Sequence, residues 1–106
     1  MDKQVIENLT KYINAITKQY KISKIILYGS FAEGKSDKNS DIDLAIFIED
    51  PAENYLSVSA GLFSFVWNID SRIEPILFTS YKDRSGFLES ILKKGKVIFH
   101  KGKLLL

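Results

Sequence analysis

The chain has 106 residues, 45% hydrophobic and 26% charged, which is an ordinary composition for one folded domain. It has no cysteine, which excludes disulfides and thiolate metal sites and suits a reducing compartment. The net charge of +2 is too small to indicate nucleic-acid binding, no run approaches a membrane span, and the N-terminus has no signal-peptide core. We therefore expect one domain over residues 1–106, in the cytoplasm.

The first half of the chain predicts a helix followed by two strands. Residues 3–20 repeat apolar side chains every three or four positions, the pattern of an amphipathic helix, with Asp2 as its N-cap. Residues 24–28 form a short β-branched run stopped by a glycine, which indicates a buried strand. A polar loop at 33–40 precedes a second strand at 42–48. Because this loop is too short for a crossover helix, the two strands are expected to be antiparallel neighbours.

The second half predicts two more helices and two more strands. Residues 53–67 predict a helix whose apolar stripe is Leu56, Ala60, Phe63 and Trp67. Residues 72–78 predict a third strand, and Pro75 favours an edge position for it. Residues 83–94 predict a helix, and 96–99 a final strand. This order indicates an α/β (α+β) fold, with a mixed sheet of about four strands and helices packed mainly on one face.

The stretch GSFAEGKSDKNSDIDLAIF holds the residues that best indicate chemistry. Gly29 follows a buried strand and lets the backbone approach a phosphate closely, and Ser30 offers a hydroxyl and an N–H group. Asp41 and Asp43 alternate along the next strand, so their carboxylates share one face, about 7 Å apart. Two hard oxygen ligands at this spacing suit a shared Mg²⁺ ion. Taken alone, Gly29-Ser30 also fits any tight turn, and Asp41-Ile42-Asp43 also fits an exposed strand start.

Glu74 is a third candidate carboxylate, and it lies inside the apolar third strand. A glutamate in such a position is unusual unless it is paired or binds metal. It could share a metal ion with the two aspartates or take the proton from an attacking hydroxyl. The alternative is an edge-strand residue facing water, which Pro75 supports, and Asp70 in the preceding turn is a weaker candidate.

The chain resembles the minimal nucleotidyltransferases of the DNA polymerase β-like superfamily, in their antitoxin form. The resemblance rests on Gly29-Ser30, the ten-residue spacing to Asp41-Ile42-Asp43 and the downstream Glu74, and it covers nearly the whole chain. It implies a single nucleotidyltransferase domain that transfers a nucleoside monophosphate, AMP from Mg-ATP, to a hydroxyl group.

The resemblance also implies residue roles. Gly29 and Ser30 would hold the β- and γ-phosphates of ATP. Asp41 and Asp43 would ligate two Mg²⁺ ions. Glu74 would complete the metal site and activate the acceptor. The implied activity is that of a metal-dependent nucleotidyltransferase with ATP as substrate.

Glu33 departs from the family's pattern, because many relatives have an arginine at this position of the Gly-Ser-x-Ala-x-Gly segment. An acidic residue beside a triphosphate opposes anion binding, and Lys35 could offset it. Whether Glu33 impairs catalysis stays open at this point.

The predicted acceptor is a protein. The predicted metal-binding residues and their scaffold occupy almost all of the 106 residues, which leaves no separate domain for acceptor recognition. The resemblance implies a HEPN-domain partner, in a toxin–antitoxin pair whose antitoxin is this chain and adenylylates its partner. The alternative is a catalytically weak or inactive binding module that neutralises or assembles with a HEPN-type partner by contact. Acceptor, nucleotide preference and oligomeric state, a homo-oligomer included, stay open.

Overall fold

The computed structural model describes residues 1–48, 55–79 and 86–106. Within these ranges the chain forms an α/β fold, as predicted, and the order of its elements is the predicted one with two additions, η1 and β5. In chain order they are α1 (Lys3–Gln19), β1 (Ile22–Tyr28), the 3₁₀ helix η1 (Gly29–Phe31), β2 (Ile42–Ile48), α2 (Tyr55–Ser64), β3 (Ile73–Phe78), α3 (Phe87–Lys94), β4 (Lys96–His100) and β5 (Lys103–Leu104).

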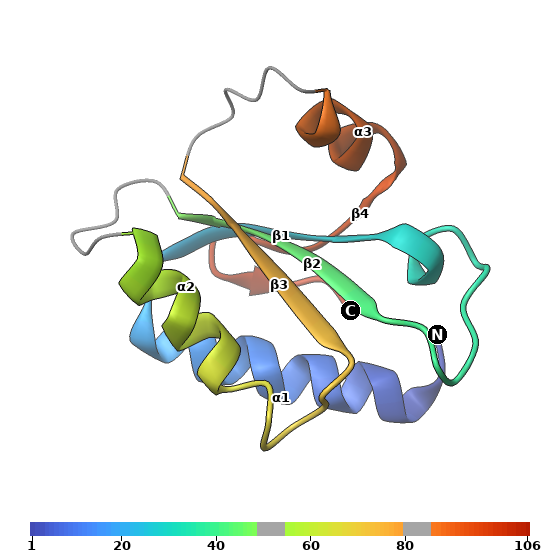
Figure 1. The fold of residues 1–106 in the computed structure, drawn as a ribbon, viewed down its shortest axis with the longest axis horizontal. Helices are drawn as coiled ribbons and strands as arrows, with labels where there is room; N and C mark the ends of the chain where they lie inside the picture. Colours follow the sequence, from blue (N-terminus) through green and yellow to red (C-terminus); the bar gives the residue numbers. More distant parts are fainter. Residues whose placement is uncertain (49–54, 80–85) are drawn as a thin grey trace.

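The strands form one mixed sheet in the order β3-β2-β1-β4-β5 (Figure 1). β1 pairs antiparallel with β2 and with β4, which confirms the prediction for the first two strands. β2 and β3 are parallel. β3 lies at an edge of the sheet, where one side of the strand has no ladder to complete, so Pro75 is tolerated there.

The sheet has one strand more than the four or so predicted. After β4, Lys101 and Gly102 both adopt positive φ, 49° and 81°, and the chain turns back so that Leu104 pairs with Phe99. Positive φ at both central residues is the geometry of a tight two-residue hairpin, which normally begins with Asn, Asp or Gly. A lysine in that first place is an uncommon signal, and the sequence therefore predicted no hairpin.

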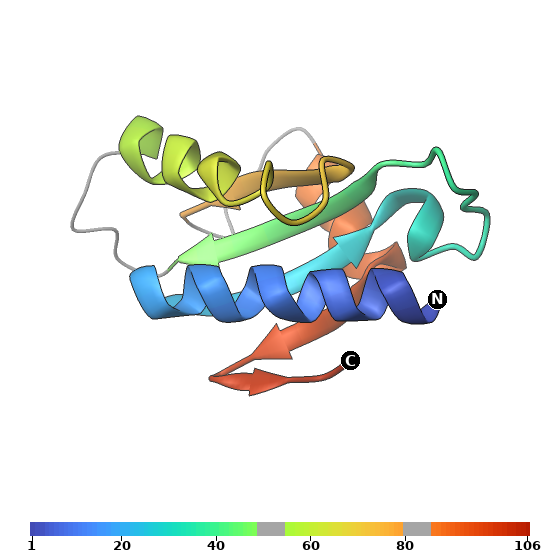
Figure 2. The ribbon, with the colours of Figure 1, turned by 90° about the horizontal axis from the view of Figure 1, so that it is seen from below.

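The helices cover the sheet unequally, as predicted. α1 and α2 lie on one face and α3 on the other (Figures 1 and 2). Asp2 caps α1 by accepting a hydrogen bond from the backbone N–H of Gln4 at 2.6 Å. The buried side of α1 consists of Val5, Leu9, Tyr12, Ile13 and Ile16.

Alternation along β2 decides which side chains face α3. Ile42, Leu44 and Ile46 belong to the core beneath the sheet, with α1 and α2. Ala45 and Phe47 pack instead with Leu88 and Ile91 of α3. Because side chains alternate along a strand, Asp43 shares the α3 face with Ala45 and Phe47.

The predicted inward stripe of α2 is wrong. α2 buries Val58 and Leu62, whereas Leu56 and Trp67 are 78% and 76% exposed, and Phe63 and Ala60 are also exposed. The segment from Tyr55 to Trp67 has no charged residue, so its apolar spacing did not single out one face. The contact with α1 does: the Tyr12 hydroxyl donates to the Leu62 carbonyl at 2.7 Å.

Two predicted helix starts fall outside the described residues, at 53–54 and at 83–85. The predicted ends can be compared. α2 ends at Ser64, three residues earlier than predicted. α3 ends at Lys94 as predicted, where the Gly95 N–H donates to the Ile91 carbonyl at 2.8 Å. Within the described ranges, no helix combines the length and apolar character needed to cross a membrane.

Candidate functional site

The turn after β1 brings Gly29 against the carboxylate of Asp43. Gly29 has a φ of 75°, which L side chains rarely adopt, and a Cβ built on it would collide with the Asp43 carboxylate oxygen. The φ disfavours any L side chain at this position, and the Asp43 carboxylate would have to move to admit one. Two parts of the predicted motif, fourteen positions apart in the chain and in different elements, are therefore in direct contact.

Three polar side chains lie in one row across the sheet. Tyr28 of β1 is paired with Asp43 of β2, and Asp43 is paired with Glu74 of β3. Directly paired residues of neighbouring strands point to the same face, with Cβ atoms about 5 Å apart. The row is on the α3 face, and Glu74 at its edge is exposed while Asp43 is half-buried. The parallel pairing thus brings Glu74 beside Asp43.

Negative charge accumulates around this row. Burial raises the pKa of the Asp43 carboxyl, and the nearby carboxylates of Asp41 and Glu74 raise it further. The pKa of the Tyr28 hydroxyl is raised to about 12, first by burial and then by Asp43 and Glu74. Tyr28 therefore stays protonated at neutral pH. Asp43 accepts no hydrogen bond from any described residue.

Asp41 precedes β2 and is exposed. The loop before it is held by a compact turn, in which the Ser40 N–H donates to the Asp37 carbonyl at 3.2 Å. The Asp37 N–H donates in return to the Ser40 hydroxyl oxygen at 2.9 Å. Just after it, the Ile42 N–H donates to the Arg72 carbonyl at 2.8 Å. These bonds position Asp41 at the end of the sheet that carries Asp43 and Glu74.

Ser30 lies in η1, and its carbonyl accepts a hydrogen bond from the Lys35 N–H at 2.9 Å. Its side-chain hydroxyl has no hydrogen-bond partner within the described part of the chain. A free hydroxyl beside a glycine turn can donate to an anion.

We call Asp43 and Glu74, together with the neighbouring Asp41, the acidic row. It has the donor chemistry of a Mg²⁺ site but not its closed geometry. Carboxylate oxygens are the ligands that Mg²⁺ prefers, and a cation would relieve the repulsion that raises the pKa of Asp43. Among the described residues, however, no three His, Cys, Asp or Glu side chains are arranged to hold a metal ion. The donor set fits the ion, and the side chains would have to converge when it binds.

Asp70 belongs to a different arrangement. Arg72 binds it with both Nε, at 3.0 Å, and a terminal nitrogen, at 2.8 Å, and Asn8 of α1 donates to it at 3.1 Å. The hydrogen bonds from Arg72 are the main reason that the pKa of Asp70 is lowered to about 2. A carboxylate held this way ties α1 to the start of β3.

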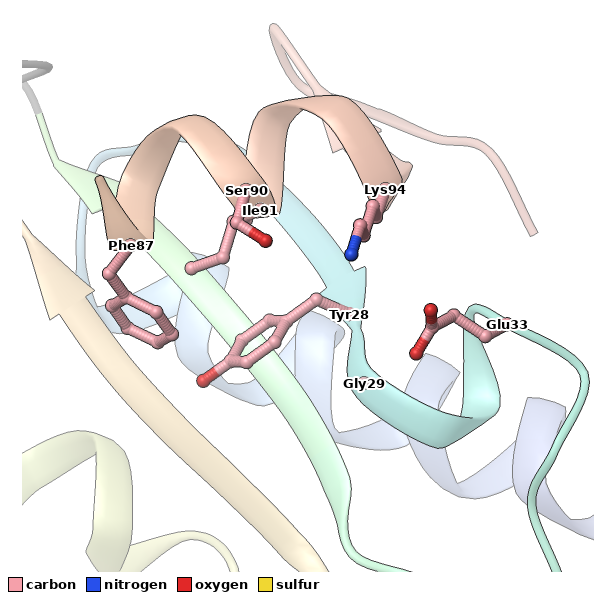
Figure 3. A pocket seen from close by; sticks show the side chains of 7 residues that line it. All are labelled: Tyr28, Gly29, Glu33, Phe87, Ser90, Ile91 and Lys94. Atoms are coloured by element: carbon pink, nitrogen blue, oxygen red, sulfur yellow. The ribbon is translucent and has the colours of Figure 1, made fainter.

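Beside the acidic row, a pocket of about 180 Å³ opens between the Gly29 turn and one face of α3 (Figure 3). Tyr28 and Gly29 line it on one side, and Phe87, Ser90 and Lys94 of α3 on the other, with Glu33 at the end near Lys94. The sequence had indicated Gly29 as a site residue but not the side chains that α3 contributes. Only their spacing of three and four residues could have suggested a common face.

The chain is similar to known proteins in its sequence and in its fold. The family model described as "Polymerase beta, Nucleotidyltransferase" matches residues 11–104. Two proteins of Methanocaldococcus jannaschii, each named "Putative protein adenylyltransferase", are similar in sequence. One, MJ0604, is 27% identical over 86% of this chain and 94% of its own length. The other, MJ1379, is 38% identical over 56% of this chain and 57% of its own length.

Two solved structures have a similar fold. A crystal structure of a toxin–antitoxin with AMP-PNP matches 92% of this chain and 72% of its own, with a TM-score of 0.61 and 22% identity. A nucleotidyltransferase from Sulfolobus solfataricus, called putative in its description, matches 100% of this chain and 97% of its own, with a TM-score of 0.66 and 18% identity. At these identities the likeness shows the fold alone.

Proposed function

Because the chain belongs to the polymerase beta nucleotidyltransferase family, we propose that it transfers the AMP portion of ATP to a hydroxyl group of a partner protein. The observation that carries the proposal is the contact of Gly29 with the Asp43 carboxylate, which lies in one row with Glu74. A phosphate at the Gly29 turn would lie next to these carboxylates. The two similar proteins named as protein adenylyltransferases support AMP as the transferred group and a protein as acceptor.

Each residue of the proposed site has its own role in this transfer. Gly29 lets the backbone approach the phosphates, and the Ser30 hydroxyl donates to them. Asp41, Asp43 and Glu74 would hold Mg²⁺, which neutralises charge on the reacting and leaving oxygens when bound. Glu74 also accepts the proton of the attacking hydroxyl, since it is exposed where an acceptor can reach it. Positioning and charge neutralisation are the main contributions to such a transfer.

The proposed partner is a HEPN-domain protein, with this chain as the antitoxin of the pair. The structure with a similar fold whose description reads "toxin-antitoxin with AMP-PNP" supports a protein partner and an ATP-like ligand. The second candidate function is a binding module that neutralises or assembles with such a partner by contact alone. It is favoured by Glu33, an exposed carboxylate close to the Gly29 turn, and by the open arrangement of the acidic row.

Transfer of labelled phosphorus separates these two functions. The full chain is incubated with its co-purifying partner, Mg²⁺ and ATP labelled either at the α- or at the γ-phosphorus. Adenylylation leaves the α-label, and not the γ-label, on the partner protein. The double variant Asp41→Asn with Asp43→Asn should remove this signal, because both carboxylates are lost without a change in side-chain size.

Glu7→Gln is the matched control, since it removes one exposed carboxylate from α1, on the opposite face of the sheet from the acidic row. It should transfer label like the unmodified chain. Transfer of the γ-label would show phosphorylation instead. Absence of any transfer, with the partner still bound, would leave the contact module as the function.

A further inference from the structure

The pocket between the Gly29 turn and α3 contains two opposite charges that do not pair. The Lys94 ammonium and the Glu33 carboxylate both point into it (Figure 3). Neither has an ion-pair partner among the residues that the structure describes. The two charges therefore face a common space without neutralising each other.

The position of the pocket relates it to the acidic row. Gly29 lines the pocket and also contacts the Asp43 carboxylate. A nucleotide whose reacting phosphorus lies beside Asp43 would reach the pocket with one of its ends. The wall that α3 contributes has a cation, Lys94, and a hydroxyl donor, Ser90, on the same side of the helix. A cation and a hydroxyl donor side by side suit a phosphate group.

We infer that Lys94 binds the terminal phosphates of the nucleotide in this pocket, and that Glu33 opposite it weakens that binding. The inference rests on the proposed function, which supplies the nucleotide, and adds a residue outside the Gly-Ser and Asp-x-Asp motif. Lys94 would compensate for the acidic Glu33 beside the Gly29 turn. Lys94 then raises the affinity for ATP, and Glu33 lowers it.

The opposite end of the pocket offers a different fit for the same nucleotide. Tyr28 and Phe87 meet edge to face there, with ring centres 5.8 Å apart. An adenine ring against these aromatic side chains would leave Lys94 beside the ribose or the α-phosphate. In that case Lys94 would contribute equally to the binding of ATP and AMP. Comparing the two nucleotides therefore distinguishes the two orientations.

The test is the dissociation constant of the full chain for ATP and for AMP, measured by equilibrium dialysis with labelled nucleotide. Lys94→Gln should weaken ATP binding about tenfold, the scale of one charge-assisted hydrogen bond, and leave AMP binding within about twofold. Glu33→Gln should tighten ATP binding about threefold, the scale of an exposed charge interaction.

Lys93→Gln is the matched control, because Lys93 is the same residue type at the same helix end and does not line the pocket. It should leave ATP binding unchanged. The inference is overturned if Lys94→Gln and Lys93→Gln have equal effects, or if Lys94→Gln weakens AMP and ATP alike. Either result would leave adenylyl transfer intact as a function. If the unmodified chain bound no ATP, both the inference and the proposed function would fail.

Discussion

Asp43 and Asp70 lie at the same end of the sheet and have opposite surroundings. Asp70 accepts hydrogen bonds from Arg72 and Asn8, its side chain is only 8% exposed, and its pKa is lowered to about 2. Asp43 has Asp41 and Glu74 as its charged neighbours, and its pKa is raised. The negative charge of Asp70 therefore stabilises the fold. The negative charge of Asp43 has no positive partner among the described residues.

An uncompensated carboxylate lowers stability, so its presence beside a glycine turn indicates a ligand that would supply the missing positive charge. The Asp70 group needs no such ligand, because Arg72 already supplies the charge. We therefore expect substitutions at the two aspartates to have different consequences. Substitution of Asp43 should reduce the rate of transfer, whereas substitution of Asp70 should lower the stability of the fold.

The largest expected difference is in catalysis. Asp43→Asn should reduce label transfer by at least about a hundredfold, because even the outer partners of metal ligands are worth about 10–100-fold. Asp70→Asn should keep transfer within about threefold at a temperature where it is folded, since Asp70 contacts only structural partners. The measurement is the initial rate of α-label transfer. Equal losses in the two variants would remove the distinction between them.

The contact between Gly29 and Asp43 should also matter for activity more than for stability. An added Cβ at Gly29 meets the end of the Asp43 side chain, which can rotate away at small cost, but the carboxylate is then displaced. We expect Gly29→Ala to transfer label about tenfold more slowly than the unmodified chain. Disturbing a partner of a metal ligand costs about 10–100-fold, and a displaced but intact carboxylate should be at the lower end of this range.

Gly34→Ala provides the control for this contact. Gly34 has nearly the same φ, 71° against 75°, but a Cβ there meets nothing within 4 Å. Both alanine variants should unfold about 1–2 kcal/mol more easily because of left-handed strain. If Gly34→Ala lost as much transfer activity as Gly29→Ala, strain in the loop, and not the Asp43 contact, would be the cause.

For Asp70 the expected effect is on stability. Asp70→Asn should lower the free energy of unfolding by about 1–2 kcal/mol at pH 7, because the charged hydrogen bonds with Arg72 are weakened. The folded-state pKa of about 2 is below the ordinary 3.8, so this stability is present above pH 3.8 and is lost as the pH falls through 2. Urea unfolding of the two proteins at pH 7 and pH 2 measures it. A deficit that is as large at pH 2 as at pH 7 would contradict the assignment.

Single helices and strands could be predicted where the residues of one segment show by themselves which side is buried. One side of α1 is apolar and the other polar, so its helical period was unambiguous. The alternation of Asp41 and Asp43 predicted that their carboxylates share one face, although β2 begins only at Ile42 and Asp41 precedes it. For α2 the same reasoning failed, since a segment without charged residues does not show which side is buried.

The composition of the site depends on contacts between distant parts of the chain. Glu74 could be suggested as unusual within a strand, but its pairing with Asp43 follows from the parallel register of β2 and β3. Lys93 and Lys94 look equivalent in the sequence, as two cations at a helix end. They differ by about 100° around the helix, and only the packing of α3 on the sheet shows that Lys94 lines the pocket.

The smallest expected effect tests whether the fold itself disfavours the charge on Asp43. An acid whose folded-state pKa is raised contributes stability below its ordinary pKa of 3.8 and loses that contribution as the pH rises through the folded value. Asp43→Asn keeps the group neutral, so in metal-free buffer at pH 7 it should raise the melting temperature by about 1–3 °C, a fraction of a kcal/mol at a partly exposed site. The gain should disappear below pH 3.8.

Added Mg²⁺ should stabilise the unmodified chain and not the variant, because the ion acts through the carboxylate that the variant lacks. A lower melting temperature for Asp43→Asn at pH 7 would mean that the Asp43 charge is compensated within the fold, as that of Asp70 is, and that the raised pKa is not a sign of a missing ligand.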